Sequence, residues 1–276
     1  MKLLKFTRHT YLTMEASEAL HSLQRIRADG VEKPPTNKNH PRLYSHNLCP
    51  FAARARYALA ANGIQFQECS CDLNEKRQWH LDINNGFVPI LELPDGTMIR
   101  ESGIVADYAI DLTRGQGIEL VPSDPVLAAK MRLKINDLKM GQIFAIYLSR
   151  GKDTEKLETY KKDALVQFES WAKEAGDKWL MGTDEITLAD TMIGPMWEVM
   201  YMMEHQYSDV SEYLDVKTNA PNWLKYVEKF RAHPALKEQR FRQKAAVAHG
   251  VRTRGWKEGE KCQLSFEVLE GAFEEQ

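Results

Sequence analysis

Two hydrophobic patterns divide this chain near residue 115. Before that point, short apolar runs alternate with helical segments, whereas after residue 125 the apolar positions follow a helical period throughout. The predicted strands are 42–45, 65–71, 88–93 and 97–100, and the predicted helices among them are 50–62, 75–81 (a short helix or turn) and 102–113. The later pattern predicts helices at about 125–150, 154–175, 187–206, 221–231 and 234–247. The chain therefore combines a mixed part with a part that is helical only.

Turn and cap signals support these boundaries. Pro94-Asp95-Gly96 is typical of a hairpin turn between the last two strands. Gly63 stands where a glycine closes a helix, and Ser102 is a favoured cap at a helix start. Thr187-x-x-Asp190 has the spacing of a capping box.

The order β-α-β-α-β-β-α is that of a thioredoxin-like domain, in which a parallel pair of strands is followed by an antiparallel hairpin. We therefore predict a two-domain α+β / all-α protein, with an N-terminal thioredoxin-like domain followed by an all-helical C-terminal domain. The glycine- and proline-bearing segment before residue 125 is the predicted linker. The expected parts are an N-terminal extension at 1–40, the thioredoxin-like domain at 41–114, the linker at 115–124, the helical domain at 125–250 and a tail at 251–276.

The N-terminal extension ends in a polar, proline-bearing stretch, 32–41, that cannot continue a helix. Before it, we expect a partly helical amphipathic segment with Leu20, Leu23 and Ile26 on its apolar face. Residues 1–14 contain basic side chains but no acidic one, a pattern also found in organelle transit peptides. An organelle address is therefore a minor alternative to a cytoplasmic location.

Composition excludes several function classes. The 276 residues are 43% hydrophobic and 28% charged, which allows a substantial core, and a net charge of −2 offers no electrostatic footprint for nucleic acid or an anionic membrane. No apolar run approaches the roughly 18 residues that a membrane helix needs. The 4 cysteines, at positions 49, 69, 71 and 262, have neither zinc-site spacing nor the density of a disulfide framework. We expect a cytoplasmic protein with no metal, nucleic acid or membrane among its partners.

Cys49-Pro50-Phe51-Ala52 lies between a predicted strand and a predicted helix. Proline is favoured in the first helical turn, so Cys49 falls at or beside the helix N-cap, where free N–H groups and the helix dipole favour a thiolate. The frame is that of a two-cysteine redox motif, but Ala52 stands at the second cysteine position. A mixed disulfide on Cys49 then needs an outside thiol to discharge it. The alternative is a small buried apolar residue without chemistry.

Two other dipeptides stand at ends of predicted strands. Val88-Pro89 opens a strand, and in thioredoxin-like folds the equivalent X-Pro bond is cis and turns the preceding backbone toward the active cysteine. Glu101-Ser102 stands at a strand-to-helix junction, where N–H groups and a hydroxyl suit a carboxylate and Glu101 suits an ammonium group. The plainer alternatives are a trans proline at an edge strand and an ordinary helix cap.

Together these residues resemble the omega class of glutathione transferases. The resemblance rests on Cys49-Pro-Phe-Ala-x-Arg-x-Arg, on Asn62-Gly-Ile, on Gly86-Phe-Val-Pro-Ile-Leu-Glu92 and on Glu101-Ser-x-Ile, and extends over residues 41–245. The later segment Trp179-Leu-Met-Gly182, followed by Thr187-Leu-Ala-Asp190, is similar to the helix-capping segment of the transferase superfamily. The resemblance implies the glutathione transferase fold, a homodimer, and glutathione as co-substrate without a metal.

The resemblance also implies a role for each site residue. Cys49 would be the catalytic residue, forming a mixed disulfide with glutathione. The glutathione-binding residues would be Phe51 beside the thiol, Lys76 at the glycyl carboxylate, Val88 and Pro89 at the cysteinyl backbone, and Glu101 with Ser102 at the γ-glutamyl group. The implied reaction is glutathione-dependent thiol transfer, as in deglutathionylation or dehydroascorbate reduction. The partners would be glutathione and a small disulfide or electrophilic substrate.

Two other functions stay open at this point. In a conjugating transferase, bound glutathione rather than Cys49 attacks an electrophile. A non-enzymatic member of the superfamily would act as a ligand carrier or a complex subunit, which the surfaces of the two terminal extensions would serve.

Overall fold

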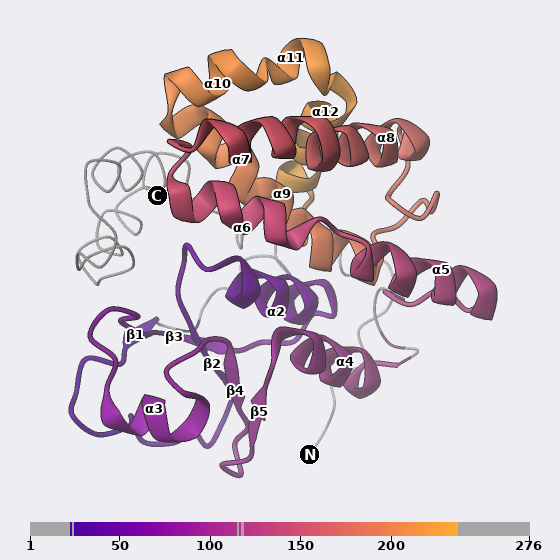
Figure 1. The fold of residues 1–276 in the computed structure, drawn as a ribbon. Helices are drawn as coiled ribbons and strands as arrows, with labels where there is room; N and C mark the ends of the chain where they lie inside the picture. The colour runs from indigo at the N-terminus through magenta and orange to yellow at the C-terminus, as the bar shows by residue number, and fades with distance from the viewer. Residues whose placement is uncertain (1–22, 24, 115, 117–118, 237–276) are drawn as a thin grey trace. The chain divides into compact units, whose positions relative to one another are not determined.

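The computed structural model describes residues 23, 25–114, 116 and 119–236 (Figure 1). The described residues cluster into two compact units, one containing the chain up to Leu120 with residues 234–236, and one containing Val121–His233. The predictions for residues 1–22, for most of the helix at 234–247 and for the tail at 251–276 lie outside the described residues.

The first unit is built on a mixed sheet. Its strands in the described residues are β1 (Ile26–Arg27), β2 (Arg42–Ser45), β3 (Gln67–Ser70), β4 (Ile90–Glu92) and β5 (Met98–Arg100), in the order β1-β3-β2-β4-β5. β1 and β2 run parallel to β3, whereas β4 runs antiparallel to β2 and to β5. The predicted parallel pair followed by a hairpin is therefore confirmed, and β1 is an addition that the sequence pattern did not predict.

Helices cover both faces of this sheet. In the described part of the first unit they are α2 (Pro50–Ala61), α3 (Gln78–Asn84) and α4 (Ser102–Leu112). Because side chains alternate along a strand, Leu43 and Leu91 point to one face and pack with α2 and α4. Tyr44 and Ile90 point to the other face, where α3 lies (Figure 1). Gly63 follows α2 with φ +65°, which is the closing role predicted for it.

The hairpin between β4 and β5 forms where its turn residues predict it. The Asp95 carboxylate accepts a hydrogen bond from the Thr97 N–H at 2.8 Å. Gly96 has φ +94°, a conformation that a residue with a Cβ adopts only with strain. The backbone N–H of Leu93 donates to the Thr97 carbonyl at 2.8 Å and closes the turn.

α3 begins later than the sequence pattern predicts, at Gln78 instead of residue 75. The Asp72 carboxylate accepts hydrogen bonds from the N–H groups of Asn74 and Glu75, at 2.8 and 2.9 Å. These bonds hold the segment in a turn, so the helix starts only after it.

The segment before β2 joins the sheet instead of forming the predicted amphipathic helix. Ile26 pairs with Cys69, and the Ala28 N–H donates to the Ser70 carbonyl at 2.8 Å. The outer side of β3 offers a row of backbone donors and acceptors, and pairing with them outweighs the local helical pattern. The helical prediction was therefore wrong at Ile26, while Leu20 lies outside the described residues.

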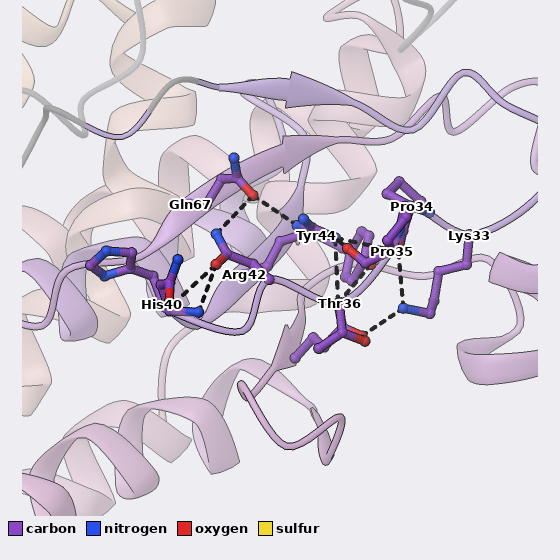
Figure 2. A network of polar contacts seen from close by, with 11 residues as sticks. Lys33, Pro34, Pro35, Thr36, His40, Arg42, Tyr44 and Gln67 are labelled. Atoms are coloured by element: carbon purple, nitrogen blue, oxygen red, sulfur yellow. Dashed lines mark hydrogen bonds and ion pairs between the residues drawn. The ribbon is translucent and has the colours of Figure 1, made fainter. Parts of the chain in front are cut away.

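A second attachment joins this segment to β4 (Figure 2). The Glu92 carboxylate is 1% exposed, and its Oε1 accepts hydrogen bonds from Lys33 Nζ at 2.6 Å and from Thr36 Oγ1 at 2.7 Å. Its Oε2 accepts a hydrogen bond from the Tyr44 hydroxyl at 2.9 Å and lies 3.6 Å from Arg42 Nη1. Burial alone raises the pKa of Glu92, but the donors outweigh burial and hold the pKa below its ordinary value.

The second unit contains helices and no strand among its described residues. Its elements are α5 (Pro125–Asn136), α6 (Met140–Ser149), α7 (Thr154–Thr159), the π-helical turn η2 (Tyr160–Leu165), α8 (Val166–Ala175), α9 (Leu188–Gln206), α10 (Ser208–Leu214), α11 (Val216–Asn219) and α12 (Pro221–Ala232). Aromatic rings join α8, α9 and α12, with the ring centroid of Phe168 5.2 Å from that of Trp197 and 6.3 Å from that of Trp223. The predicted fold class, a thioredoxin-like domain followed by an all-helical domain, is confirmed.

The predicted capping box at the start of α9 is also confirmed. The Asp190 carboxylate accepts hydrogen bonds from the N–H and the hydroxyl of Thr187, at 2.6 and 2.7 Å. It further accepts a hydrogen bond from the Leu180 N–H at 2.9 Å, which fixes the preceding loop to the helix start.

The helix predicted at 125–150 is interrupted at residues 137–139. Gln167 of α8 pairs with the backbone on both sides of the break: its Nε2 donates to the Asp137 carbonyl at 3.0 Å, and its Oε1 accepts from the Lys139 N–H at 3.3 Å. A side chain from a distant helix thus replaces the backbone bonds that a continuous helix would make. No local pattern could predict this.

Candidate functional site

The register of the sheet brings the predicted site segments together at one edge of the sheet, the edge formed by the ends of the strands. Tyr44 pairs with Ile90, and Ile90 pairs with Arg100, so these residues form a row across β2, β4 and β5. Ser45, the next residue of β2, pairs with Ser70 at the end of β3. The segments that leave or enter the sheet beside this row carry all the predicted site residues: Cys49 and Phe51 after β2, Lys76 after β3, Val88 and Pro89 before β4, and Glu101 and Ser102 after β5.

Cys49 is the N-cap residue of α2. Its backbone is extended, with φ −87° and ψ 115°, and its carbonyl accepts a hydrogen bond from the Ala53 N–H at 3.0 Å. The half-buried side chain packs against an apolar cluster that includes Tyr44 and Val88. Ala52, at the second cysteine position of the motif, is fully buried. A thiol at the start of a helix therefore stands without a second thiol in the same motif.

The charge state of Cys49 reflects two opposed effects. Burial raises the pKa of Cys49 above its ordinary value, whereas the N–H groups of Ala52 and Phe51 and the guanidinium groups of Arg56 and Arg54 act to lower it. The helix start does favour the thiolate, as predicted, but the net direction is opposite to the prediction. The sequence pattern places the sulfur at the N-terminus of a helix, yet it contains no measure of how far the sulfur is removed from water.

Sequence reasoning missed His46 and Arg54 as residues of this site. The buried His46 accepts a hydrogen bond from the Leu48 N–H on Nδ1 at 3.1 Å, and its carbonyl accepts one from the Cys49 N–H at 3.0 Å. The Arg54 guanidinium lies 5.4 Å from the ring centroid of Phe51, and burial lowers the pKa of Arg54 to about 10, although the Cys49 thiolate opposes this. The available signal for Arg54 was its place in the Cys49-Pro-Phe-Ala-x-Arg-x-Arg motif.

The peptide bond between Val88 and Pro89 is cis, as expected for this position. Both residues are buried, and Val88 belongs to the apolar cluster on which Cys49 packs. β4 begins only at Ile90, so the backbone of Val88 lies outside the paired part of the strand. Its pairing with a peptide-like thiol stays a prediction.

Lys76 lies along Gly86 and Phe87. Its Nζ is 4.8 Å from the ring centroid of Phe87, and a Cβ added to Gly86 would come within 2.3 Å of the lysine Cδ. Gly86 has φ +67°, a backbone conformation that favours glycine, and its lack of a Cβ lets the Lys76 side chain lie against it. Lys76 therefore lies beside the segment that leads into Val88, while its predicted contact with a carboxylate stays untested.

Glu101 is the N-cap residue of α4, and Ser102 is its first helical residue, so the cap lies one residue earlier than predicted. The Glu101 carbonyl accepts a hydrogen bond from the Val105 N–H at 2.9 Å, and its backbone has φ +68°. This conformation costs a residue with a Cβ about 1 kcal/mol or more, and such residues cluster at ligand sites. The Glu101 side chain is exposed while Ser102 is buried.

The other described cysteines, Cys69 and Cys71, are buried, unlike the half-buried Cys49. Burial raises the pKa of Cys69 to about 12, and burial raises the pKa of Cys71 well above its ordinary value. Cys262 lies outside the described residues. In the part of the chain that the structure describes, no helix has the length and apolar character to cross a membrane, and no group of histidine, cysteine and acidic side chains is arranged to hold a metal ion.

Comparison with known proteins gives the family. The family model for the N-terminal domain of glutathione S-transferases matches residues 43–117, and the model for the C-terminal domain matches residues 136–239. Glutathione S-transferase omega-1 of Sus scrofa is 27% identical over 200 residues, which cover 71% of this chain and 79% of the pig protein. Glutathione S-transferase omega-2 of Mus musculus is 26% identical over 202 residues, which cover 71% of this chain and 76% of the mouse protein.

A solved structure agrees in fold. Glutathione transferase Omega 1C from Trametes versicolor superimposes with a TM-score of 0.64 at 22% identity, covering 77% of this chain and 95% of the fungal chain. Glutathione is the co-substrate of this family. The chain therefore belongs to the glutathione S-transferase family, and the class that it resembles within the family is omega.

Proposed function

We propose that this protein reduces glutathionylated thiols or dehydroascorbate with glutathione, through a mixed disulfide on Cys49. The observation that carries the proposal is the thiol at the N-terminus of α2, with Ala52 at the position of a second cysteine. A mixed disulfide on such a thiol can be discharged only by a thiol from outside the motif. Glutathione, the co-substrate of the family, is that thiol.

The reaction consists of two thiol–disulfide exchanges. The Cys49 thiolate attacks the glutathionyl sulfur of a substrate R–S–S–G, the disulfide bond breaks, and R–S⁻ leaves and takes up a proton. The thiolate of a free glutathione then attacks the glutathionyl sulfur on Cys49, releasing oxidised glutathione and the Cys49 thiolate. With dehydroascorbate, two glutathione thiols are oxidised to one disulfide while the acceptor takes up two electrons and two protons and becomes ascorbate.

The glutathione moiety lies, in this proposal, along the sheet edge that carries the site segments. The Val88 backbone pairs with its cysteinyl part, with Pro89 turning that backbone toward the thiol, and Phe51 packs beside the sulfur. Glu101 and Ser102 bind its γ-glutamyl end, for which the N-terminus of α4 and the positive φ of Glu101 are the support. Lys76 binds the glycyl carboxylate, and its ammonium leaves the face of Phe87 to do so.

The raised pKa of Cys49 sets the pH dependence of this reaction. The thiolate is the attacking species, and at neutral pH it is the minor form of Cys49. The rate of the first exchange therefore rises with pH through neutrality and beyond the ordinary cysteine value of about 8.5. A thiolate of high pKa is intrinsically more nucleophilic, which offsets part of the small thiolate fraction.

The same observation supports a second candidate function. A Cys49 that stays protonated at neutral pH can donate a hydrogen bond to the thiolate of bound glutathione, and glutathione is then the nucleophile. In that case the protein conjugates glutathione to small electrophiles, and serine at position 49 preserves or improves the activity.

The deciding experiment is intact mass spectrometry after incubation with oxidised glutathione, followed by turnover with a glutathionylated peptide, dehydroascorbate and an aromatic electrophile. The proposal expects one glutathione adduct, lost in Cys49→Ser and retained in the control Cys71→Ala, with the reductase turnover lost in parallel. No adduct on the native protein, together with conjugation that survives Cys49→Ser, would transfer the assignment to the second candidate.

We also propose that the protein acts as a homodimer in the cytoplasm. Support for the dimer is that glutathione transferases are generally dimeric. Support for the location is that the described cysteines are free thiols, as expected in a reducing compartment. Sedimentation equilibrium tests the dimer, and imaging of the full chain with a C-terminal tag tests the location.

A further inference from the structure

Glu68 of β3 is a buried carboxylate that the proposed exchange reaction does not use. Its side chain is 4% exposed and lies between two arginines from different parts of the chain. Burial alone raises the pKa of Glu68, but the charges of Arg56 and Arg25 outweigh burial and lower the pKa to about 2. The carboxylate is therefore ionised at any physiological pH and links two cations.

Arg56 of α2 joins this carboxylate to the loop that presents Cys49. Its Nη1 donates to Glu68 Oε1 at 2.9 Å and to Asn47 Oδ1 at 3.3 Å, and its Nη2 donates to the Asn47 carbonyl at 3.2 Å. The same Nη1 lies 3.5 Å from Ser45 Oγ at the end of β2. The planar guanidinium thus holds the loop between β2 and Cys49 from several sides, which a lysine ammonium cannot do.

Arg25 connects the N-terminal segment to the other oxygen of the same carboxylate. Its Nε lies 3.3 Å from Glu68 Oε2, and the pairing of Ile26 with Cys69 places Arg25 next to Glu68 across the two strands. Ile26 and Ala28 of the same segment pack with the apolar cluster against which Cys49 lies. The segment is therefore connected to the surroundings of Cys49 in two ways, by the Arg25–Glu68 ion pair and by apolar packing.

We propose that Arg25, Glu68 and Arg56 form a chain of positioning residues through which the N-terminal segment holds the loop 46–48 and sets Cys49 against the N-terminus of α2. The proposal rests on the thiol chemistry proposed above and adds the segment before β2 to its machinery. None of the three touches the reacting sulfur in this role. Their effect is to keep the sulfur near the N–H groups of Phe51 and Ala52 and near the positive charge of Arg56.

The test distinguishes two explanations for an effect of Arg25 on Cys49: transmission through Glu68 and Arg56, or the general electrostatic effect of removing one positive charge. The pH profile of Cys49 alkylation by iodoacetamide gives the midpoint of thiol ionisation, and kcat/KM for a glutathionylated peptide gives the turnover. Arg25→Gln is expected to raise the midpoint by about half a pH unit and to lower kcat/KM about two- to fivefold, the range that a partly exposed ion pair supports. The control Arg27→Gln removes the same charge from an exposed arginine two residues further along the same segment and is expected to leave both values unchanged.

A double-mutant cycle then tests the route through Glu68. In a Glu68→Gln background, Arg25→Gln is expected to have no further effect, because the link to the loop is already cut. If Glu68→Gln does not give folded protein, Arg56→Lys serves as the second member, since it keeps the charge and loses the forked contacts. Arg56→Lys is itself expected to lower kcat/KM at least about tenfold, because small displacements of a reacting group are costly. Arg54, the other charged group that acts on the thiol, is unchanged in every variant, as is His46 of the loop.

Three results would overturn the proposal: native values in Arg25→Gln, an equal effect of Arg25→Gln in both backgrounds, or an equal effect in Arg27→Gln. The alkylation profile requires no glutathione and no turnover. If the native protein forms no glutathione adduct, the proposed function fails, yet the midpoints of the variants still decide whether this chain of residues positions the thiol.

Discussion

Two buried glutamates, one in each unit, respond to burial in opposite ways. Glu92 of β4 is 1% exposed and Glu204 of α9 is 8% exposed. Hydrogen-bond donors from the N-terminal segment and from β2 surround Glu92 and hold its pKa below the ordinary value. Burial and the charge of Asp215 raise the pKa of Glu204 to about 8, with Lys217 opposing them. The donors that reach a carboxylate, and not burial alone, decide its charge at neutral pH.

The tyrosines beside these glutamates show the same contrast. The Tyr44 hydroxyl donates to Glu92, whereas the fully buried Tyr160 hydroxyl and Glu204 Oε1 have no hydrogen-bond partner among the described residues. Tyr160 opens the π-helical turn η2, and such turns often mark strained or functional positions. At Glu92 a buried charge therefore joins distant segments of the sheet unit, whereas at Tyr160 and Glu204 the helical unit retains polar atoms without a hydrogen-bond partner among the described residues.

The largest expected change in the free energy of unfolding is the one caused by Glu204→Gln at alkaline pH. Because the pKa of Glu204 is raised to about 8 in the folded chain, native stability falls as pH rises from about 4.5 to 8, and this loss is absent from the variant. The variant is expected to match the native protein at pH 3 and to exceed its free energy of unfolding by on the order of 4–5 kcal/mol at pH 9. Urea unfolding at both pH values measures this, with the exposed Glu212→Gln as control. A constant difference across the range would mean that Glu204 is ionised in the folded state.

Glu92→Gln is expected to change stability in the opposite direction: the variant is less stable than the native protein at neutral pH, and the difference becomes smaller at acidic pH. The lowered pKa of Glu92 contributes stability above its unfolded value of about 4.3, and that contribution is lost as pH falls through the folded pKa. At pH 7 the variant is expected to lose about 2–3 kcal/mol, less than for a fully buried pair because Lys33 reaches solvent. Unfolding curves of the variant and the native protein at pH 7 and pH 3 should differ less at the lower pH. Equal losses at both would contradict an ionised Glu92.

The smallest expected change in the free energy of unfolding comes from removing a tyrosine hydroxyl, either in the sheet unit or in the helical unit. Tyr44→Phe removes a donor from Glu92 and is expected to cost about 1–2 kcal/mol, whereas Tyr160→Phe removes a hydroxyl without a described partner and is expected to be neutral or to stabilise by up to about 1 kcal/mol. Thermal unfolding of the two variants at pH 7 gives the comparison directly. A loss in Tyr160→Phe as large as that in Tyr44→Phe would reveal a partner for the Tyr160 hydroxyl.

The parts of the fold that the sequence predicts well are those set by neighbouring residues. The strand at 42–45, the turn at Asp95 and the capping box at Thr187 follow from local spacing and side-chain chemistry, and the structure confirms each. The two-residue strand β1 and the break stabilised by Gln167 depend on partners far away in the chain, and no local pattern contains them.

In the candidate site, too, the features set by neighbouring residues were predicted and those set by tertiary packing were not. The sequence placed Cys49 at a helix start and Val88-Pro89 before a strand, because proline and strand patterns are local signals. The direction of the pKa of Cys49 was mispredicted because it depends on burial, which arises only when the whole unit packs. Arg56 reads as an ordinary helix charge until the position of Glu68 is known.

The short strand β1 has a further consequence for how this protein behaves in solution. By pairing with β3, it shields backbone groups that would otherwise form an open template for strands of other molecules. Proteolysis between residues 28 and 41 would uncover that template while leaving the cysteine-bearing helix in the chain. A clipped molecule of this kind is expected to self-associate into aggregates, so a protease can remove this protein from solution without cutting the segment that carries Cys49.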